Sequence, residues 1–125
     1  MLVYKKKTEQ EKKEERKDRK EITSAKIQER ERRKYERYMN ELVEAVTRIG
    51  KNEILLHKFF QDILSSAEYK EIGTRWQIIK QLGRGVTQFQ VAENLRVGVA
   101  TVTRGAHALK DGSGGFRKAL KKSRR

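Results

Sequence analysis

The chain has 125 residues, a length that favours one domain, and its net charge of +14 (pI about 10.2) indicates a polyanionic partner, usually nucleic acid and sometimes an anionic membrane surface. Cysteine is absent, which excludes disulfides and thiolate metal sites, and the two histidines, His57 and His107, have no companions at ligand spacing, so no metal site is expected. No set of residues suggests catalysis, so we expect a protein that is not an enzyme. No apolar run approaches the ~20 residues that cross a bilayer, and no signal peptide is recognisable, so we expect the protein to be soluble and cytoplasmic.

The first 34 residues form a predicted basic N-terminal arm. Residues 1–40 hold 15 Lys or Arg against 9 Asp or Glu, and residues 5–34 contain almost nothing to bury. Opposite charges four residues apart, such as Glu29 with Arg33, can support a helix. Glu9 with Lys13 and Glu15 with Arg19 have the same spacing. The segment is predicted to be either a solvated helix or a disordered arm, and in a sharper interpretation it reaches DNA phosphates.

The absence of proline and the recurrence of apolar residues every three or four positions predict an all-α fold. From Tyr35 to Ile49 these residues share one helical face, and Gly50 is expected to end the helix. Asn52 can cap a second helix, residues 54–64, which is apolar over most of its circumference. So broad an apolar surface suggests a second subunit, although a central helix in a monomer would have a similar pattern.

A capping box, Ser65 to Glu68, opens the third predicted helix. Its inward side is predicted to contain Ile72, Trp76, Ile79 and Leu82. The glycines at 83 and 85 are expected to end it.

The segment from Thr87 to Lys110 has the pattern of a helix-turn-helix, whose second helix enters the DNA major groove. Thr87 to Gln90 is a second predicted capping box. A seam between the two helices is expected from Val91, Ala92, Leu95, Val97 and Val102. Core spacing in the second helix includes Val99, Val102, Ala106 and Leu109. The break near Arg96 requires a left-handed residue, which costs on the order of 1 kcal/mol without glycine. Short side chains at the start of the second helix can approach base edges, and the predicted DNA-facing residues are Gln88, Gly98, Val99, Ala100, Thr101 and Thr103.

Residues 111–125 are predicted to be a glycine-rich break followed by a basic tail. The break covers Asp111 to Gly115, and Phe116 and Leu120 can form one side of a short final helix. Residues 110–125 hold 7 Lys or Arg and one Asp, so both ends of the chain are basic.

Two short motifs and one further residue of this sequence point to a known family. The motifs are Glu71-Ile-Gly-Thr-Arg75 and Gly-Val-Ala-Thr-Val-Thr-Arg-Gly (Gly98 to Gly105), and the residue is Gln88. In these the sequence resembles the tryptophan repressor family. The resemblance covers about residues 35–110. It implies an all-α, intertwined homodimer with a helix-turn-helix, and a repressor that binds palindromic operators in double-stranded DNA with L-tryptophan as corepressor. The broad apolar helix agrees with a shared core.

The resemblance also implies a ligand site. Arg75 and Arg104 correspond to the arginines that flank the indole and meet the carboxylate, Thr101 and Gly105 would line the pocket, and Ser65 would offer its hydroxyl. The sequence departs from the family at several places. Ala108 stands where the family has a serine, Phe89 and Ala92 where it has base-reading basic residues, and Arg96 where it has the turn glycine, and the loop before Thr87 is one residue shorter.

Other interpretations stay open on the sequence alone. Because Arg and Lys are scarce in the helix-turn-helix, the chain could be a non-specific basic DNA-binding accessory protein without an effector, bound mainly through its ends. A helical adaptor at a membrane surface ranks below both, because the arm has almost no apolar face. Arg75 could also be only a surface ion-pair partner of Glu71.

Overall fold

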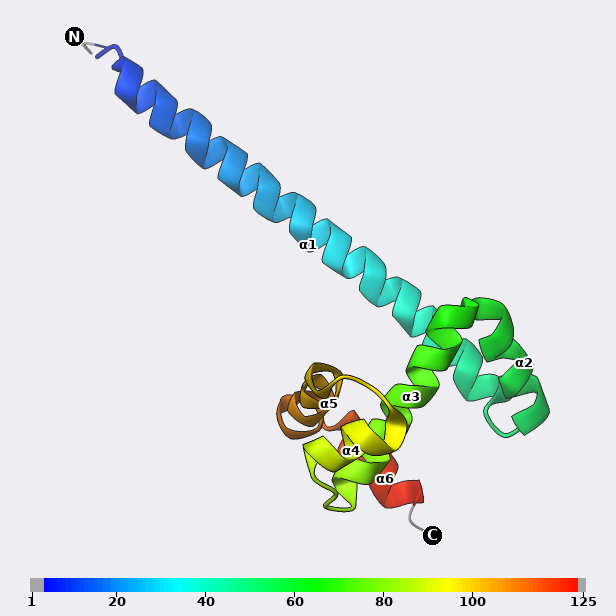
Figure 1. The fold of residues 1–125 in the computed structure, drawn as a ribbon. Coiled ribbons are helices and arrows are strands. Elements are labelled where there is room, and N and C mark those ends of the chain that lie inside the picture. Colours follow the sequence, from blue (N-terminus) through cyan, green and yellow to red (C-terminus); the bar gives the residue numbers. More distant parts are fainter. Residues whose placement is uncertain (1–3, 124–125) are drawn as a thin grey trace. The chain divides into compact units, whose positions relative to one another are not determined.

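The computed structural model describes residues 4–123, and its elements are all α-helices, as the sequence predicts. The helices are α1 (Glu9–Ile49), α2 (Glu53–Ile63), α3 (Ser66–Gly83), α4 (Gln88–Leu95), α5 (Val99–Asp111) and α6 (Gly115–Ser123) (Figure 1). Residues 1–3 of the predicted arm and 124–125 of the predicted tail lie outside the described part. The chain divides into two compact units, residues 1–56 and 57–125. None of the helices in the described residues has the length and apolarity that a membrane span requires.

Helix α1 is continuous through the predicted arm. Thr8 begins it with a capping box, in which the Thr8 hydroxyl accepts from the Glu11 amide at 3.2 Å and the Glu11 carboxylate accepts from the Thr8 amide at 2.8 Å. The helix passes residue 34 without interruption and ends before Gly50, so its 41 residues span about 61 Å. From Glu9 onward the arm is therefore a solvated helix, while a boundary at residue 34 stays a prediction.

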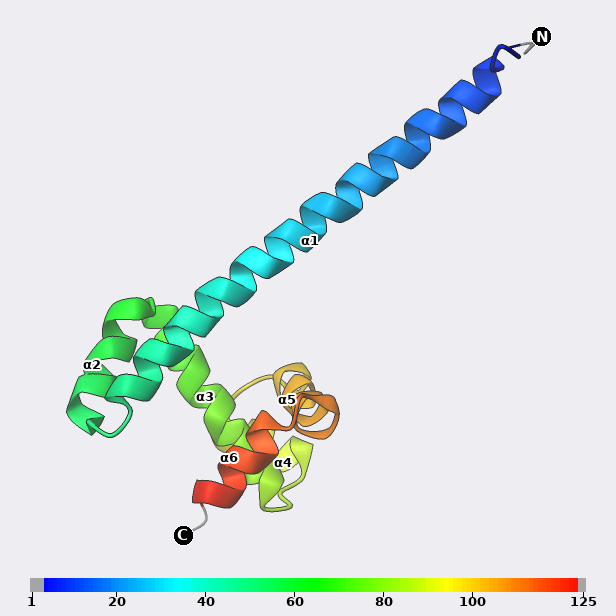
Figure 2. The same cartoon turned by 180° about the vertical axis from the view of Figure 1, so that it is seen from behind.

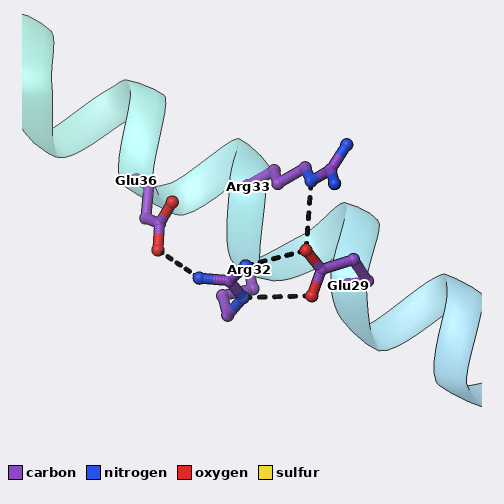
Figure 3. A network of polar contacts seen from close by, with 4 residues as sticks. All are labelled: Glu29, Arg32, Arg33 and Glu36. Carbon is purple, nitrogen blue, oxygen red and sulfur yellow. Dashed lines mark hydrogen bonds and ion pairs between the residues drawn. The ribbon is translucent and has the colours of Figure 1, made fainter.

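Charged side chains of α1 form a network on one side of the helix (Figure 3). Arg32 donates to both Glu29 oxygens at 2.7 and 3.1 Å and to Glu36 at 2.6 Å, and Arg33 donates to Glu29 at 3.1 Å. The hydrogen bonds from Arg32 and then Arg33 lower the pKa of Glu29 to about 2. The predicted Glu29–Arg33 pair is confirmed.

Of the other two charge pairs predicted in the arm, Glu9 with Lys13 is wrong, and Glu15 with Arg19 is present only as a longer-range interaction. Glu9 lies 3.5 Å from Lys12, one residue before the predicted Lys13. Glu15 forms its ion pair with Lys7, which precedes the helix, and the hydrogen bond from Lys7 together with the charges of Lys7 and Arg19 lowers the pKa of Glu15. Both carboxylates have several cations within reach along the sequence, so the four-residue spacing alone does not select the partner.

Apolar residues before and within α2 are left uncovered in the single chain. The Asn52 side-chain oxygen Oδ1 accepts from the Leu55 amide at 3.1 Å, which confirms the predicted cap of this helix. No residue of α2 is buried, and Ile54 is 72% exposed. Tyr35, Tyr38 and Met39 on α1 are also exposed, each by more than half.

The hydrophobic core of residues 57–125 forms where α3, α4 and α5 meet, and α6 packs against α3 and α5 (Figure 2). Its fully buried members are Ile78, Val91 and Val102, each at most 1% exposed. Ile79 is also buried, as predicted, but the inward assignment of Ile72 is wrong because it is 48% exposed. The C-terminal half of α3 is surrounded by three helices, so two consecutive isoleucines are buried there, which a single inward face does not predict.

Candidate nucleic-acid interface and ligand cavity

The turn between α4 and α5 is built by local hydrogen bonds. Thr87 caps α4, accepting from the Gln90 amide at 3.2 Å. The reciprocal half of the predicted capping box is absent, and the side chain of Gln90 instead donates from Nε2 to Asn94 at 2.8 Å. Arg96 ends α4 with φ 55° and ψ 46°, the left-handed conformation expected at this position, and the Val97 amide then donates to the Ala92 carbonyl at 3.1 Å.

The seam and the outer surface of this pair of helices separate as the sequence predicts, with one exception. The seam residues Val91, Ala92 and Val102 are buried, while Leu95 and Val97 are partly buried beside them. Gly98, Val99 and Ala100, at the start of α5, are exposed. The sequence predicts Val99 both at core spacing and on the outer surface. It is 46% exposed, so the core assignment is wrong and the outward assignment is confirmed. Small side chains therefore cover the outer surface of the first turn of α5.

A polar contact joins the start of α4 to α5. The Thr103 hydroxyl lies 2.9 Å from the Gln88 side-chain oxygen and 3.0 Å from the Val99 carbonyl, so its single proton has two competing acceptors. The side-chain nitrogen of Gln88 has no hydrogen-bond partner among residues 4–123 and can donate outward. Two residues predicted to face DNA are thus held together, of which Gln88 is exposed and Thr103 is half-buried.

A cavity of about 550 Å³ lies between α3 and α5, and Phe116 of α6 also lines it. Four of the five residues predicted to bind a ligand line it: Arg75, Thr101, Arg104 and Gly105. The apolar part of the lining comes from Ile78, Ile79, Val97, Ala108 and Phe116. Ala108 presents only a methyl group, so its side chain offers no hydrogen bond to a ligand.

Positive charge predominates in the lining of the cavity. Arg75 donates to Glu71 at 2.7 Å, and both side chains are largely exposed, so this ion pair has little effect on stability. The guanidinium of Arg104 has no hydrogen bond or ion pair with any residue in the described range. Lys70 adds a third cation, and Glu71 is the single carboxylate of the lining. The balance favours an anionic group in the cavity, with Arg104 as the unoccupied donor.

Gly105 allows α3 and α5 to approach closely. A Cβ atom at this position would lie 2.7 Å from Cγ2 of Ile78 and 3.8 Å from Cδ1 of Ile79. A carbon–carbon distance of 2.7 Å is well inside van der Waals contact, so a larger residue forces buried side chains to move. The glycine therefore has a packing function in addition to its place in the lining.

Ser65 lies apart from the cavity lining. Its hydroxyl accepts from the Glu68 amide at 3.2 Å and its own amide donates to the Glu68 carboxylate at 2.9 Å. This confirms the predicted capping box, and the hydrogen bonds from the Ser65 backbone and then its side chain lower the pKa of Glu68. In the described structure Ser65 is a helix cap, and contact with a ligand stays a prediction.

Comparison with known proteins extends this geometry to a family. The profile of the family described as Trp repressor protein matches residues 37–124 of this chain. The chain belongs to the Trp repressor family. Proteins named Trp operon repressor homolog from Chlamydia trachomatis, serovars L2 and D, are 40% identical over 70 residues, which make up 52% of this chain and 74% of each relative. No solved structure matches the chain.

The Trp repressor match includes the cavity and the α4–α5 pair, and it starts after most of α1. Sequence reasoning did not predict Lys70, Thr74 and Phe116 as parts of the cavity. The two residues of α3 precede Ile78 by eight and four positions and so share its side of the helix, a signal that could have found them. Phe116 could not be placed there from the sequence, because its position depends on how α6 returns to α3 and α5.

Proposed function

We propose that this protein is a sequence-specific DNA-binding transcriptional repressor whose affinity for its operator depends on an aromatic carboxylate such as L-tryptophan. Membership of the Trp repressor family supports repression and DNA binding. The observation that carries the proposal is the position of Thr101 on the charged cavity, directly after the exposed Val99 and Ala100 of the same helix turn. A ligand in the cavity would thus contact the helix that presents residues to DNA.

The proposed DNA contact uses the first turns of α5. Gly98, Val99, Ala100, Thr101 and Thr103 carry no long side chain, so this helix end can lie close to base edges, where methyl groups contact thymine and hydroxyls form hydrogen bonds. The side chain of Gln88, oriented by Thr103, would reach a phosphate or a base. The net charge of +14 would hold the protein against the phosphate backbone.

The proposed active form is a homodimer. The exposed apolar side chains of α2 and of the second half of α1 in the single chain support this form, since monomers rarely leave contiguous apolar surface uncovered. A twofold dimer would present two copies of α5 to successive major grooves about 34 Å apart, which matches a palindromic operator. Protein concentration would then enter the binding equilibrium.

The proposed effector role follows from the composition of the cavity. Arg104 and Arg75 can pair with a carboxylate and stack on an aromatic ring, while Ile78, Ile79 and Phe116 provide apolar contacts. A ligand that binds the DNA-competent arrangement of α3 and α5 more tightly than other arrangements would raise the population of that arrangement. The absence of a hydroxyl at Ala108 weakens the case for recognition of the ligand's ammonium group at that point.

The test is a selection of random duplex DNA by the purified chain, with and without L-tryptophan, followed by calorimetry of the ligand. We expect enrichment of a palindromic sequence and tighter binding with the ligand present. Arg104→Gln should abolish the heat of binding, while Arg84→Gln, which removes an exposed charge outside the cavity lining, should retain it. Absence of an enriched sequence would refute specific repression, and absence of heat would refute the effector.

The second candidate is a non-specific basic DNA-binding accessory protein without an effector. One observation favours it: none of the six residues predicted to face DNA is Lys or Arg, the residues that most often read guanine. This candidate predicts equal affinity for all duplexes of one length and no response to L-tryptophan. The same selection experiment distinguishes the two.

A further inference from the structure

The cationic side chains of α1 are aligned along the helix. At roughly 100° per residue, eight positions between residues 12 and 37 share an arc of roughly 80°. Seven of them are Lys or Arg and the eighth is Thr23. We call this set the cationic face: Lys12, Arg16, Arg19, Lys26, Arg30, Lys34 and Arg37.

Carboxylates gather on a separate side of the same helix. A second arc of roughly 80°, centred about 140° away around the helix axis, contains eight positions between residues 11 and 36. Six of these are acidic, and the other two are Ala25 and Arg32. Arg32 is the cation that bonds Glu29 and Glu36 in Figure 3. Six of the eight carboxylates between residues 11 and 36 therefore lie away from the cationic face.

The cations of the cationic face are largely without partners, unlike their neighbours. Lys12 lies 3.5 Å from Glu9, and Lys34 lies 3.8 Å from Glu31 and over the Tyr35 ring. Within residues 4–123, the remaining five make no hydrogen bond or ion pair, although the charge of Arg19, after the contact with Lys7, contributes to the lowered pKa of Glu15. All of the face is exposed except Lys34, which is half-buried. By contrast, Arg32, across the axis from the face, and Arg33, about 60° from the centre of the face, are both bonded to Glu29.

Alignment of like charges has a cost for the helix. Lys12 and Arg16, Lys26 and Arg30, and Arg30 and Lys34 lie four residues apart. Like charges at this spacing destabilise a helix by about 0.2–0.5 kcal/mol per pair, whereas opposite charges stabilise it by a similar amount. A helix that served only as a solvated extension would place opposite charges at these positions, so the arrangement indicates an external anionic partner.

We propose that the cationic face of α1 binds the phosphate backbone of duplex DNA, as a second contact independent of the α4–α5 pair. The inference rests on the proposed function in one respect, that the ligand is DNA. The face extends over about 37 Å, close to one ~34 Å turn of the duplex. A repeating polyanion of this length is the partner that a row of unpaired cations fits.

The carboxylates of α1 do not cancel this attraction. The helix with its side chains is about 10–12 Å thick, and the Debye length at 0.1–0.15 M salt is about 8–10 Å. A phosphate on the cationic face therefore interacts with the cations in front of it while the carboxylates behind the axis are screened. The same carboxylates orient the helix, since they repel the backbone if α1 turns.

The chemistry of α1 disfavours an anionic membrane as the partner. Binding at a bilayer interface requires an apolar face beside the basic one. In the basic part of α1 the large aliphatic residues are Ile22 and Ile27, which lie about 140° apart around the axis and form no common face.

The test compares two double variants of the full chain that each remove two positive charges from α1. Arg30→Gln with Arg37→Gln removes unpaired cations of the cationic face. Lys17→Gln with Arg32→Gln removes two cations that lie about 140° and 160° from the centre of the face and is the matched control. Affinity for a random duplex of about 40 base pairs, roughly four turns, is measured by fluorescence anisotropy between about 50 and 200 mM KCl.

We expect the variant of the cationic face to bind less tightly and with a weaker salt dependence. Each phosphate contact contributes about 0.9 to the slope of log K against log salt, so one lost contact lowers affinity roughly 8-fold at 0.1 M salt and two lower it roughly 60-fold. The control should change affinity less than about 2-fold. Arg30→Lys with Arg37→Lys should restore binding, because phosphate contact needs charge more than geometry.

Three outcomes would overturn the inference. An equal loss of DNA affinity in both Gln variants would indicate an effect of net charge alone, and no loss of affinity in either variant would remove the contact. A change in the molecular mass of the assembly in the Arg30/Arg37 variant would assign the face to a second copy of the chain. Circular dichroism at 222 nm confirms that each variant keeps its helix. Sequence selection by α5 is measured separately in the unmodified chain. Absence of a sequence preference there would refute the proposed function, but the salt slopes of the α1 variants would still test the cationic face.

Discussion

The close packing at Gly105 predicts an unusual response to alanine. In a helix interior Gly→Ala normally stabilises by about 0.8–1.0 kcal/mol. At Gly105 the added Cβ would meet Cγ2 of Ile78 at 2.7 Å, and Ile78 is 1% exposed, so it has little room to move. Overpacking of this kind costs about 1–3 kcal/mol. We therefore expect Gly105→Ala to be neutral to about 2 kcal/mol destabilising, in place of the usual gain.

A double-mutant cycle isolates the clash. Leucine lacks the Cγ2 methyl, so in an Ile78→Leu background Gly105→Ala should regain most of the helix-propensity benefit. Gly73→Ala is the matched control, because nothing lies within 4 Å of a Cβ at that position on α3. Urea unfolding followed by circular dichroism, at one fixed protein concentration, gives the free energies. If Gly105→Ala and Gly73→Ala stabilised the chain equally, the inferred close approach of α3 and α5 would be refuted.

Three further predictions concern single residues. Ser65→Ala should lower the free energy of unfolding by about 1 kcal/mol through loss of the α3 cap, a loss that Ser65→Asp should largely avoid in the same urea experiment. Because the pKa of Glu29 is lowered from 4.5 to about 2 in the helix, its stabilising contribution is complete above pH 4.5 and is lost as the pH falls toward 2; ellipticity at 222 nm should decrease over this range, and less in Glu29→Gln. Arg96→Gly should relieve the left-handed strain and stabilise by up to about 1 kcal/mol, whereas Arg84→Gly, at φ −88°, should destabilise; an equal effect at both sites would contradict the strain.

Local rules of sequence predicted the boundaries of the helices well. Asn52, Ser65 and Thr87 each accept the backbone hydrogen bond expected of a cap. The left-handed residue was placed correctly at Arg96. These features depend on interactions within four residues, so neighbouring sequence contains the information needed to predict them.

Contacts between distant parts of the chain were harder to predict. Periodicity assigned Ile72 inward and missed Ile78, because it assumes one buried face while the second half of α3 is covered from several sides. Residues 5–34 of the chain contain few apolar side chains to bury, and the residues that recur there at helical spacing are the charged ones. The partners of Glu9 and Glu15 depended on side-chain geometry that spacing does not fix. Phe116 reaches the cavity only because α6 returns to the core.

The sequence of α5 is best understood from the three environments that its faces meet. Val102 is buried in the core, Thr101 and Gly105 border the cavity, and Val99 and Ala100 face solvent at the start of the helix. A 13-residue helix with three such neighbourhoods has no broad polar face, and each neighbourhood limits side-chain size for its own reason. Packing against Ile78 requires glycine, the cavity requires room, and close approach to base edges would require short side chains. Because Thr101 lies between the cavity and the exposed turn, a change in the filling of the cavity would reach the proposed DNA contact through one residue, without a rearrangement of the core.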